Sequence, residues 1–208
     1  MMYHSEHGQD AWLEEHVFRG LTGGVFVEAG ALDGLLHSNS LFFERERGWT
    51  GVLVEANPEL RFALRANRPK ADVFGCALGA ENGTAKFEAV AGGLIGWSGL
   101  TDLIEPEHRA RIDTRIPPEY RGIVDVNVRP LADVLYETGT RFVDYLSLDL
   151  EGAEWSVLSV FPFDEFHIDV IGVEDNFGNA KLADLLASNG YTHLARVGQD
   201  EIWRRLGE

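Results

Sequence analysis

Residues 24–34 have the sequence GVFVEAGALDG, and this stretch decides the fold. Its β-branched and apolar residues are typical of a buried strand, and Gly30 ends the run. A second glycine at position 34 indicates that a tight turn follows the strand. Two later segments repeat this short apolar pattern: GVLVEAN at 51–57 and ADVFGCAL at 71–78. The sequence therefore predicts strands over 24–30, 51–57 and 71–78.

Longer segments with apolar residues at helical spacing alternate with these runs. Leu13, Val17 and Leu21, for example, recur at every fourth position of the chain. Helices are predicted over 9–21, 38–48, 58–67, 130–139, 152–161 and 181–190. Further strands are predicted over 84–90, 126–128, 142–150 and 168–176. The segments YTHLARV and EIWRR flank Gly198-Gln199-Asp200, so they predict a terminal hairpin.

Alternation of helices with continuously apolar strands indicates a mostly parallel sheet covered on both faces. We expect one α/β domain over residues 1–208, with three layers and a C-terminal antiparallel hairpin. Residues 91–125 mix glycine, proline and charge. They are expected to form an irregular insertion with one short helix near 106–112, in a place suited to a substrate lid.

The composition excludes several classes of protein. The net charge of −16 repels polyphosphate, which argues against nucleic acid as a partner. Cys76 is the single cysteine, so neither an intrachain disulfide nor a cysteine zinc cluster can form. A signal-peptide pattern is absent from the first residues, and no apolar run has the length of a membrane span. We expect a cytoplasmic protein without a membrane partner, and the sequence leaves a homodimer open.

Ligands of open parallel sheets bind beyond the carboxyl ends of the strands. The turn at 30–34 lacks the G-x-G-x-x-G fingerprint of dinucleotide-binding proteins. Glu55, at the end of the second predicted strand, is placed to accept hydrogen bonds from both hydroxyls of a ribose. Glu28 and Asp33 flank the turn, and their carboxylates suit a cationic ligand better than a pyrophosphate. These features predict an adenosine-type cofactor with a cationic centre, such as S-adenosylmethionine.

Several motifs in this order resemble the FkbM-type methyltransferases. They are HGQD (7–10), FVEAGALDG (26–34), HSNSLFFERERGWTGVLVEANP (37–58), NRP (67–69), YLSLDLEGAEWSVL (145–158) and VIGVEDN (170–176). The resemblance implies the Rossmann-like methyltransferase fold, with a seven-stranded sheet, and S-adenosylmethionine as cofactor. Leu32 departs from the family pattern, because an asparagine is frequent there.

The resemblance also implies which residues contact the cofactor. Glu28, Gly30 and Gly34 would line its methionine end, and Glu55 would hold the ribose. Cys76 and Ala77 would border the adenine. Ser38 and Asn39 would begin a helix whose free N–H groups face the cofactor carboxylate, although Ser38 also suits a simple helix cap. Gln9 and Asp10 resemble the family's N-terminal motif and would either close over the site or form the opening turn of the first predicted helix.

Carboxylates follow two neighbouring predicted strands. Asp149 and Glu151 end one strand, and Glu174 and Asp175 end the next. Three interpretations stay open. The cluster supplies a general base, with Asp149 as first choice; it holds a divalent cation such as Mg²⁺; or it orients the cofactor while Glu151 caps the helix at 152–161.

Residues outside this cluster offer alternatives. His37 is a second candidate base, and Trp97 is a candidate aromatic wall for the acceptor. The resemblance implies an O-methyltransferase that acts on a small hydroxylated acceptor such as a sugar or a polyketide-like molecule. The alternatives are a degenerate methyltransferase-like binding domain and a nicotinamide-dependent oxidoreductase on a similar fold.

Overall fold

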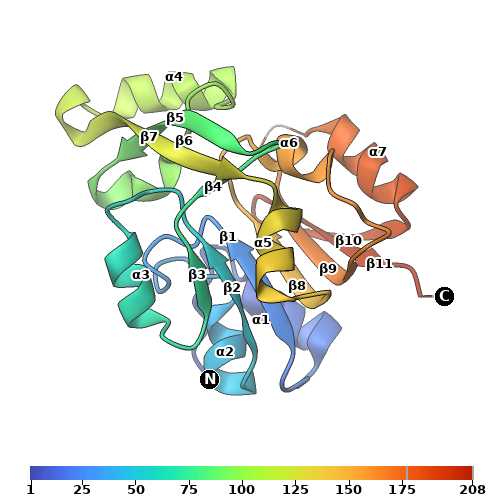
Figure 1. Ribbon diagram of the computed structural model, residues 1–208. Helices are drawn as coiled ribbons and strands as arrows, with labels where there is room; N and C mark the ends of the chain where they lie inside the picture. Colours follow the sequence, from blue (N-terminus) through green and yellow to red (C-terminus); the bar gives the residue numbers. More distant parts are fainter. Residues whose placement is uncertain (177, 208) are drawn as a thin grey trace.

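Seven strands form the main sheet of the computed structural model, which describes residues 1–176 and 178–207 (Figure 1). The strand order is β10-β11-β9-β8-β1-β2-β3. The strands are β1 (Val25–Ala29), β2 (Thr50–Val54), β3 (Asp72–Phe74), β8 (Phe142–Leu148), β9 (His167–Glu174), β10 (Tyr191–Val197) and β11 (Asp200–Arg205). All neighbours from β9 to β3 run parallel, whereas β11 is antiparallel to both β9 and β10. The mostly parallel seven-stranded sheet and its terminal hairpin are confirmed.

Alternate residues of the strands enter two separate cores. Phe26 and Leu53 pack with aromatic residues of the segment 42–49 on one face. Val27 and Val52 pack on the other face with residues of three later helices. Because the side-chain period of a strand is two, this alternation means that both faces are covered.

The helices lie between the strands, as predicted, but most are shorter. They are α1 (Gln9–Leu13), α2 (Leu41–Arg47), α3 (Arg61–Asn67), α4 (Pro106–Arg115), α5 (Leu131–Thr138), α6 (Glu154–Leu158) and α7 (Ala180–Ser188), with a π-helical turn, η1 (Glu14–Phe18), after α1. Gly48 and Gly139 end α2 and α5 in the left-handed conformation, with φ of 66° and 71°. Glycine adopts that conformation at little cost, so the sequence correctly predicts where these two helices end.

A second, four-stranded sheet corrects the expectation of an irregular insertion. Its order is β4-β7-β5-β6, with β4 (Ala77–Leu78), β5 (Gly83–Val90), β6 (Gly99–Leu100) and β7 (Arg121–Arg129). The 3₁₀ turns η2 (Gly92–Trp97) and η3 (Pro118–Tyr120) complete the segment. The segment 91–125 is therefore largely regular, and its helix α4 confirms the one expected near 106–112. The prediction of a strand over 126–128 covers only the end of β7, because most residues of β7 are at least partly exposed and no apolar run marks its first part.

The strand predicted over 71–78 is divided between the two sheets. Phe74 is the last residue of β3, and Ala77 begins β4 of the second sheet, where it pairs with Val128. This break brings the second sheet over the carboxyl ends of β1 and β2 (Figure 1). The helices within the described part of the chain all fall short of the length and apolar character that crossing a bilayer requires.

Candidate active site

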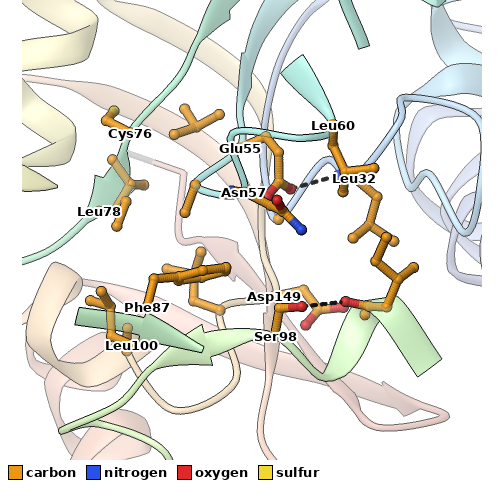
Figure 2. A pocket seen from close by; sticks show the side chains of 18 residues that line it. Leu32, Glu55, Asn57, Leu60, Cys76, Leu78, Phe87, Ser98, Leu100 and Asp149 are labelled. Carbon is orange, nitrogen blue, oxygen red and sulfur yellow. Dashed lines mark hydrogen bonds between the residues drawn. The ribbon is translucent and has the colours of Figure 1, made fainter. Parts of the chain in front are cut away.

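A pocket lies between the carboxyl ends of the main strands and the second sheet (Figure 2). We call it the apolar pocket. Five predicted cofactor residues line it: Gly30, Glu55, Cys76, Ala77 and Asp149. The second sheet and its loops add residues that sequence reasoning missed, namely Leu78, Phe87, Ile95, Gly96, Ser98 and Leu100. The result is a slot with apolar walls and two carboxylates, a lining suited to an adenosine.

Glu55 is buried at the rim of this slot, directly after β2. Its carboxylate accepts hydrogen bonds from the backbone N–H groups of Leu32, at 2.8 Å, and of Asn57, at 2.6 Å (Figure 2). Burial raises the pKa of Glu55 to about 7, and these backbone hydrogen bonds oppose the shift. A carboxylate oxygen accepts more than one hydrogen bond, so this fixed group retains capacity for the hydroxyls of a ribose.

Gly30 is required by the close approach of two chain segments at the floor of the pocket. Its φ is +83°, and a Cβ atom on it would lie 2.0 Å from the carbonyl oxygen of Asp149. The N–H of Asp149 in turn donates to the carbonyl of Ala29, at 3.1 Å. The missing side chain therefore lets the ends of β1 and β8 meet, which places Asp149 beside the turn at residues 30–34.

Glu28 has an internal partner for each of its oxygens. Ser38 donates to Oε2 at 2.8 Å, and the N–H of Asn39 donates to Oε1 at 2.7 Å; the hydroxyl of Ser40 donates as well. The guanidinium of Arg68 lies 3.8 Å away. The structure thus places Glu28, Ser38 and Asn39 in one buried network, off the wall of the apolar pocket. Ser38 also accepts from the N–H of Leu41, which agrees with its interpretation as a helix cap.

Asp33 and Gly34 shape the turn itself. Asp33 accepts hydrogen bonds from the N–H groups of Leu35 and Leu36, at 2.9 and 2.8 Å. Gly34 has a φ of +80°, and a Cβ atom on it would lie 2.6 Å from the side chain of Arg68. Neither residue lines the apolar pocket. Their positions identify them as supports for the turn that follows β1.

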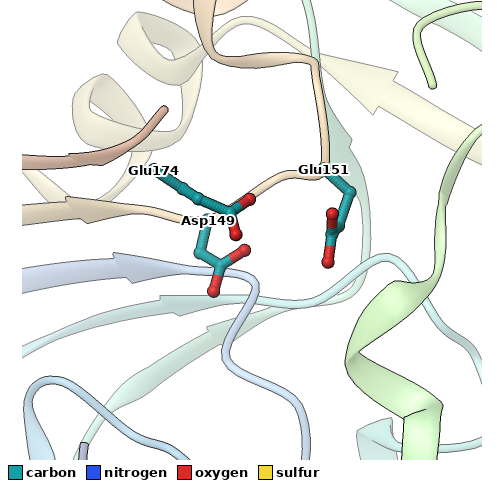
Figure 3. A group of neighbouring side chains, drawn as sticks. All are labelled: Asp149, Glu151 and Glu174. Carbon is teal, nitrogen blue, oxygen red and sulfur yellow. The ribbon is translucent and has the colours of Figure 1, made fainter. Parts of the chain in front are cut away.

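Asp149, Glu151 and Glu174 converge at the far end of the apolar pocket (Figure 3). One carboxylate oxygen of each lies within 4.8 Å of the others. Burial, reinforced by neighbouring carboxylates, raises the pKa of Asp149 to about 8 and that of Glu151 to about 9. The same causes raise the pKa of Glu174 well above its ordinary value. Three of the four carboxylates predicted at this rim therefore converge, whereas Asp175 accepts hydrogen bonds from the N–H groups of Gly178 and Asn179. Groups with such raised pKa values can exchange protons near neutral pH.

Glu154, rather than Glu151, holds the loop that leads into α6. Its carboxylate accepts from the N–H groups of Leu150, at 2.6 Å, and Gly152, at 3.1 Å. Glu151 adopts a left-handed φ of 54° and has no capping hydrogen bond to α6. The expectation that Glu151 caps this helix is therefore wrong: the described residues give α6 no side-chain cap, and Glu154, its first residue, instead holds the loop between β8 and α6.

A second, more polar pocket opens on the other side of the carboxylate cluster. We call it the acidic pocket, and its wall is formed by residues 102–108, 151–152, 154–156, 174–176, 178–179 and 181–182. His108 of α4 is buried in this wall, with its Nε2 atom 3.4 Å from Oε2 of Glu151. Burial lowers the pKa of His108. The sequence offered no signal for His108, because its partner lies 43 positions away and joins it only through the fold.

The remaining predicted residues lie at the periphery. His37 is half exposed and pairs with Glu6 at 3.1 Å. Trp97 packs against His108, with ring centroids 5.5 Å apart, and lines neither pocket. Gln9 donates to the buried Asp200 at 3.1 Å. Asp10 accepts hydrogen bonds from His4 and Ser5. Together with the contact between Gln9 and Asp200, these bonds hold the N-terminal segment against the start of β11.

The sequence matches the methyltransferase FkbM domain over residues 28–192. Among solved structures, the methyltransferase FkbM from Methylobacillus flagellatus KT is similar in fold, with a TM-score of 0.51 and 13% identity. The alignment covers 88% of this chain and 43% of that one, so this chain spans less than half of that protein's length. A TehB-like SAM-dependent methyltransferase from Corynebacterium glutamicum aligns over 97% of this chain and 89% of its own, with 9% identity and a TM-score of 0.47.

No curated protein matches the sequence. The family match nevertheless extends from within β1 to the start of β10 and so includes both pockets and the carboxylate cluster. This chain belongs to the FkbM methyltransferase family.

Proposed function

We propose that this methyltransferase uses S-adenosylmethionine to methylate a hydroxyl group of a small acceptor. One observation supports the proposal above others: the carboxylate cluster lies where the apolar pocket meets the acidic pocket. Asp149 lines the first pocket, whereas Glu151 and Glu174 line the second. A cofactor in one pocket and an acceptor in the other would therefore meet at the cluster.

The residues of the apolar pocket fit the cofactor. Leu78, Phe87 and Leu100 offer apolar surface to an adenine, and Glu55 offers a fixed carboxylate to the ribose. The negative charge at Asp149 suits a sulfonium. When bound, S-adenosylmethionine supplies an electrophilic methyl group whose sulfur leaves as a neutral thioether. A nicotinamide cofactor lacks comparable support, because the turn after β1 is acidic and has no G-x-G-x-x-G spacing.

The carboxylate cluster supplies the proton acceptor. A hydroxyl oxygen that forms a bond to carbon must release its proton, and a carboxylate accepts that proton when it is ionised; a pKa near the working pH makes the ionised group a stronger base. We assign this task to Asp149, because it lines the apolar pocket and is itself one of the three clustered carboxylates. His108 holds Glu151 from the other side and keeps the wall of the acidic pocket in place.

A divalent cation is the second candidate use of this cluster. Three carboxylate oxygens within 4.8 Å of one another match the donors that Mg²⁺ prefers. Such an ion would lower the pKa of a bound hydroxyl. Titration with Mn²⁺, followed by electron paramagnetic resonance, distinguishes the two: one bound ion that is lost in Glu151→Gln supports the metal, and no bound ion supports the general base.

The direct test is a methyl-transfer assay. The protein is incubated with S-adenosylmethionine and a panel of hydroxylated compounds, and S-adenosylhomocysteine is quantified by mass spectrometry. We expect release that depends on an acceptor and is lost in Asp149→Asn. Binding of S-adenosylhomocysteine without release across a broad panel would instead support a degenerate binding domain.

A further inference from the structure

Arg61 of α3 is a partly buried cation beside the apolar pocket, and it follows Leu60 of the pocket wall. Within residues 1–176 and 178–207 its guanidinium forms neither a hydrogen bond nor an ion pair, and its Nε atom is buried without an acceptor. A cation in the first turn of a helix also opposes the helix dipole. Because both features are unfavourable for folding, helix stability does not explain why an arginine lies here.

The backbone at Gly75, between β3 and β4, leaves the space that Arg61 occupies. A Cβ atom on Gly75 would lie 2.3 Å from Nε and 2.6 Å from Cζ of Arg61. The residues on either side of Gly75 both belong to the surroundings of the pocket. The carbonyl of Phe74 accepts from the N–H of Glu55 at 3.0 Å, and Cys76 lines the pocket (Figure 2). The guanidinium therefore packs against the segment that connects Glu55 to the apolar wall.

The charge of Arg61 acts on the pocket residues at both ends of this segment. Burial raises the pKa of Glu55 and of Cys76, and Arg61 opposes the rise in each case. Backbone N–H groups also stabilise the Glu55 carboxylate, but they carry no net charge. The other titratable or charged groups around this end of the molecule are Asp33 in the turn after β1, Arg129 of β7 beside Cys76, and Asp149 across the pocket.

We propose that Arg61 is a positioning residue of the cofactor site, which supplies the counter-charge that keeps Glu55 ionised for the hydroxyls of the ribose. This inference rests on the proposed function, because it takes the apolar pocket as the cofactor site. Arg61 does not line that pocket, so it acts through Glu55 and not by contact with the cofactor. An ionised carboxylate accepts stronger hydrogen bonds than a protonated one, so the contribution of Arg61 to binding depends on pH.

The test is the pH profile of binding of 5′-methylthioadenosine, measured by calorimetry between pH 6 and pH 9. This probe carries the adenine and the ribose of the cofactor, and none of its groups titrates in that range. Binding to the natural protein should tighten as pH rises through about 7, where Glu55 ionises. In Arg61→Gln the midpoint should move up by about one pH unit, so that binding is several-fold weaker at pH 6 and nearly unchanged at pH 9. An unshifted midpoint would overturn the proposal.

Three further variants separate the local charge of Arg61 from its bulk and from the net charge of the protein. Arg61→Lys keeps the charge and should have a midpoint closer to that of the natural protein than Arg61→Gln has. Gly75→Ala removes no charge but takes the space of the guanidinium, so it should shift the midpoint upward. Arg65→Gln, at an exposed position one turn later in α3, should not shift it. Equal shifts in Arg65→Gln and Arg61→Gln, or identical profiles of Arg61→Lys and Arg61→Gln, would overturn the proposal.

A double variant shows whether Arg61 acts through Glu55. Glu55→Gln cannot ionise at this position, so any pH dependence that remains in it belongs to other groups such as Asp149. Adding Arg61→Gln to Glu55→Gln should leave binding of the probe unchanged at every pH. Further weakening would reveal a structural role or a direct contact of Arg61 and would overturn the proposal.

The natural protein separates this inference from the proposed function. If it binds neither 5′-methylthioadenosine nor S-adenosylhomocysteine, the proposed function is contradicted and the inference is overturned with it. If it binds both, and the midpoint for the probe is the same with and without Arg61, only the role assigned to Arg61 is contradicted.

Discussion

The guanidinium of Arg68 lies 3.8 Å from the carboxylate of Glu28, and neither side chain has appreciable contact with solvent. Arg68 also donates to Glu44 at 2.8 Å, to Ser40 at 2.9 Å and to Ser38 at 3.1 Å. This fully buried cation neutralises the acid at the end of β1 and fixes the turn that bounds the apolar pocket.

Removal of Arg68 should therefore destabilise the protein strongly. Arg68→Met leaves Glu28 and Glu44 buried without a cation, which costs about 3–5 kcal/mol in comparable cases. Urea denaturation of this variant should show that loss, whereas Arg65→Met, at an exposed position of α3 three residues earlier, should change the unfolding free energy by less than about 1 kcal/mol. Equal, small effects of both substitutions would contradict the assigned network.

The acidic interior predicts that stability falls as pH rises. Burial raises the pKa of Glu55 and Glu154 to about 7, of Asp200 to about 6, of Asp149 to about 8 and of Glu151 to about 9. In the unfolded chain these groups titrate near pH 4. Between those limits the folded protein holds more protons than the unfolded chain, so its stability is greatest at low pH and is lost as pH rises through about 6–9.

Differential scanning fluorimetry checks this pH dependence. The Tm should be lower at pH 9 than at pH 6, by about 2–4 °C for each kcal/mol lost in a protein of this size. A Tm that is constant or rises over this range would contradict the assigned burial of these carboxyl groups.

Asp149→Asn should abolish methyl transfer and raise the stability of the folded protein. The amide cannot ionise, so it removes one charge from the crowded cluster and relieves Glu174 and Glu151. We expect the Tm of the variant to exceed that of the natural protein by an amount that grows from pH 6 to pH 9, and we expect the variant to lose methyl transfer. Asp164→Asn, at an exposed position, serves as the control and should change neither property. Parallel Tm curves for Asp149→Asn and the natural protein would contradict the prediction.

Gly30→Ala should be more damaging than a glycine substitution without steric conflict. Both Gly30 and Gly139 have positive φ, of 83° and 71°, but a Cβ atom at Gly139 would have no neighbour within 4 Å. Gly139→Ala should therefore cost only the conformational penalty of about 1–2 kcal/mol. Gly30→Ala should cost more and weaken binding of S-adenosylhomocysteine, as measured by urea denaturation and calorimetry. Equal losses would show that the contact with Asp149 is unimportant.

The strand ends could be predicted from the sequence because buried parallel strands are continuous apolar runs. Glu55 and Asp149 follow such runs directly, so their convergence at one edge of the sheet was foreseeable. The partner of Glu28 could not be predicted, because the sequence does not reveal that Arg68, 40 positions later, is buried against it. The second sheet escaped prediction for a similar reason, since the pairing of Phe87 with Val124 depends on tertiary structure.

The most direct test of the cofactor site is calorimetric titration with S-adenosylhomocysteine of the natural protein, Glu55→Ala and the control Glu59→Ala, with NAD as a second ligand. We predict micromolar binding of S-adenosylhomocysteine, no binding of NAD, and a loss of about 1.5–3 kcal/mol in Glu55→Ala alone, which is the contribution of hydrogen bonds to a charged group. Binding that is unchanged in Glu55→Ala, or a preference for NAD, would contradict the placement of the cofactor in the apolar pocket.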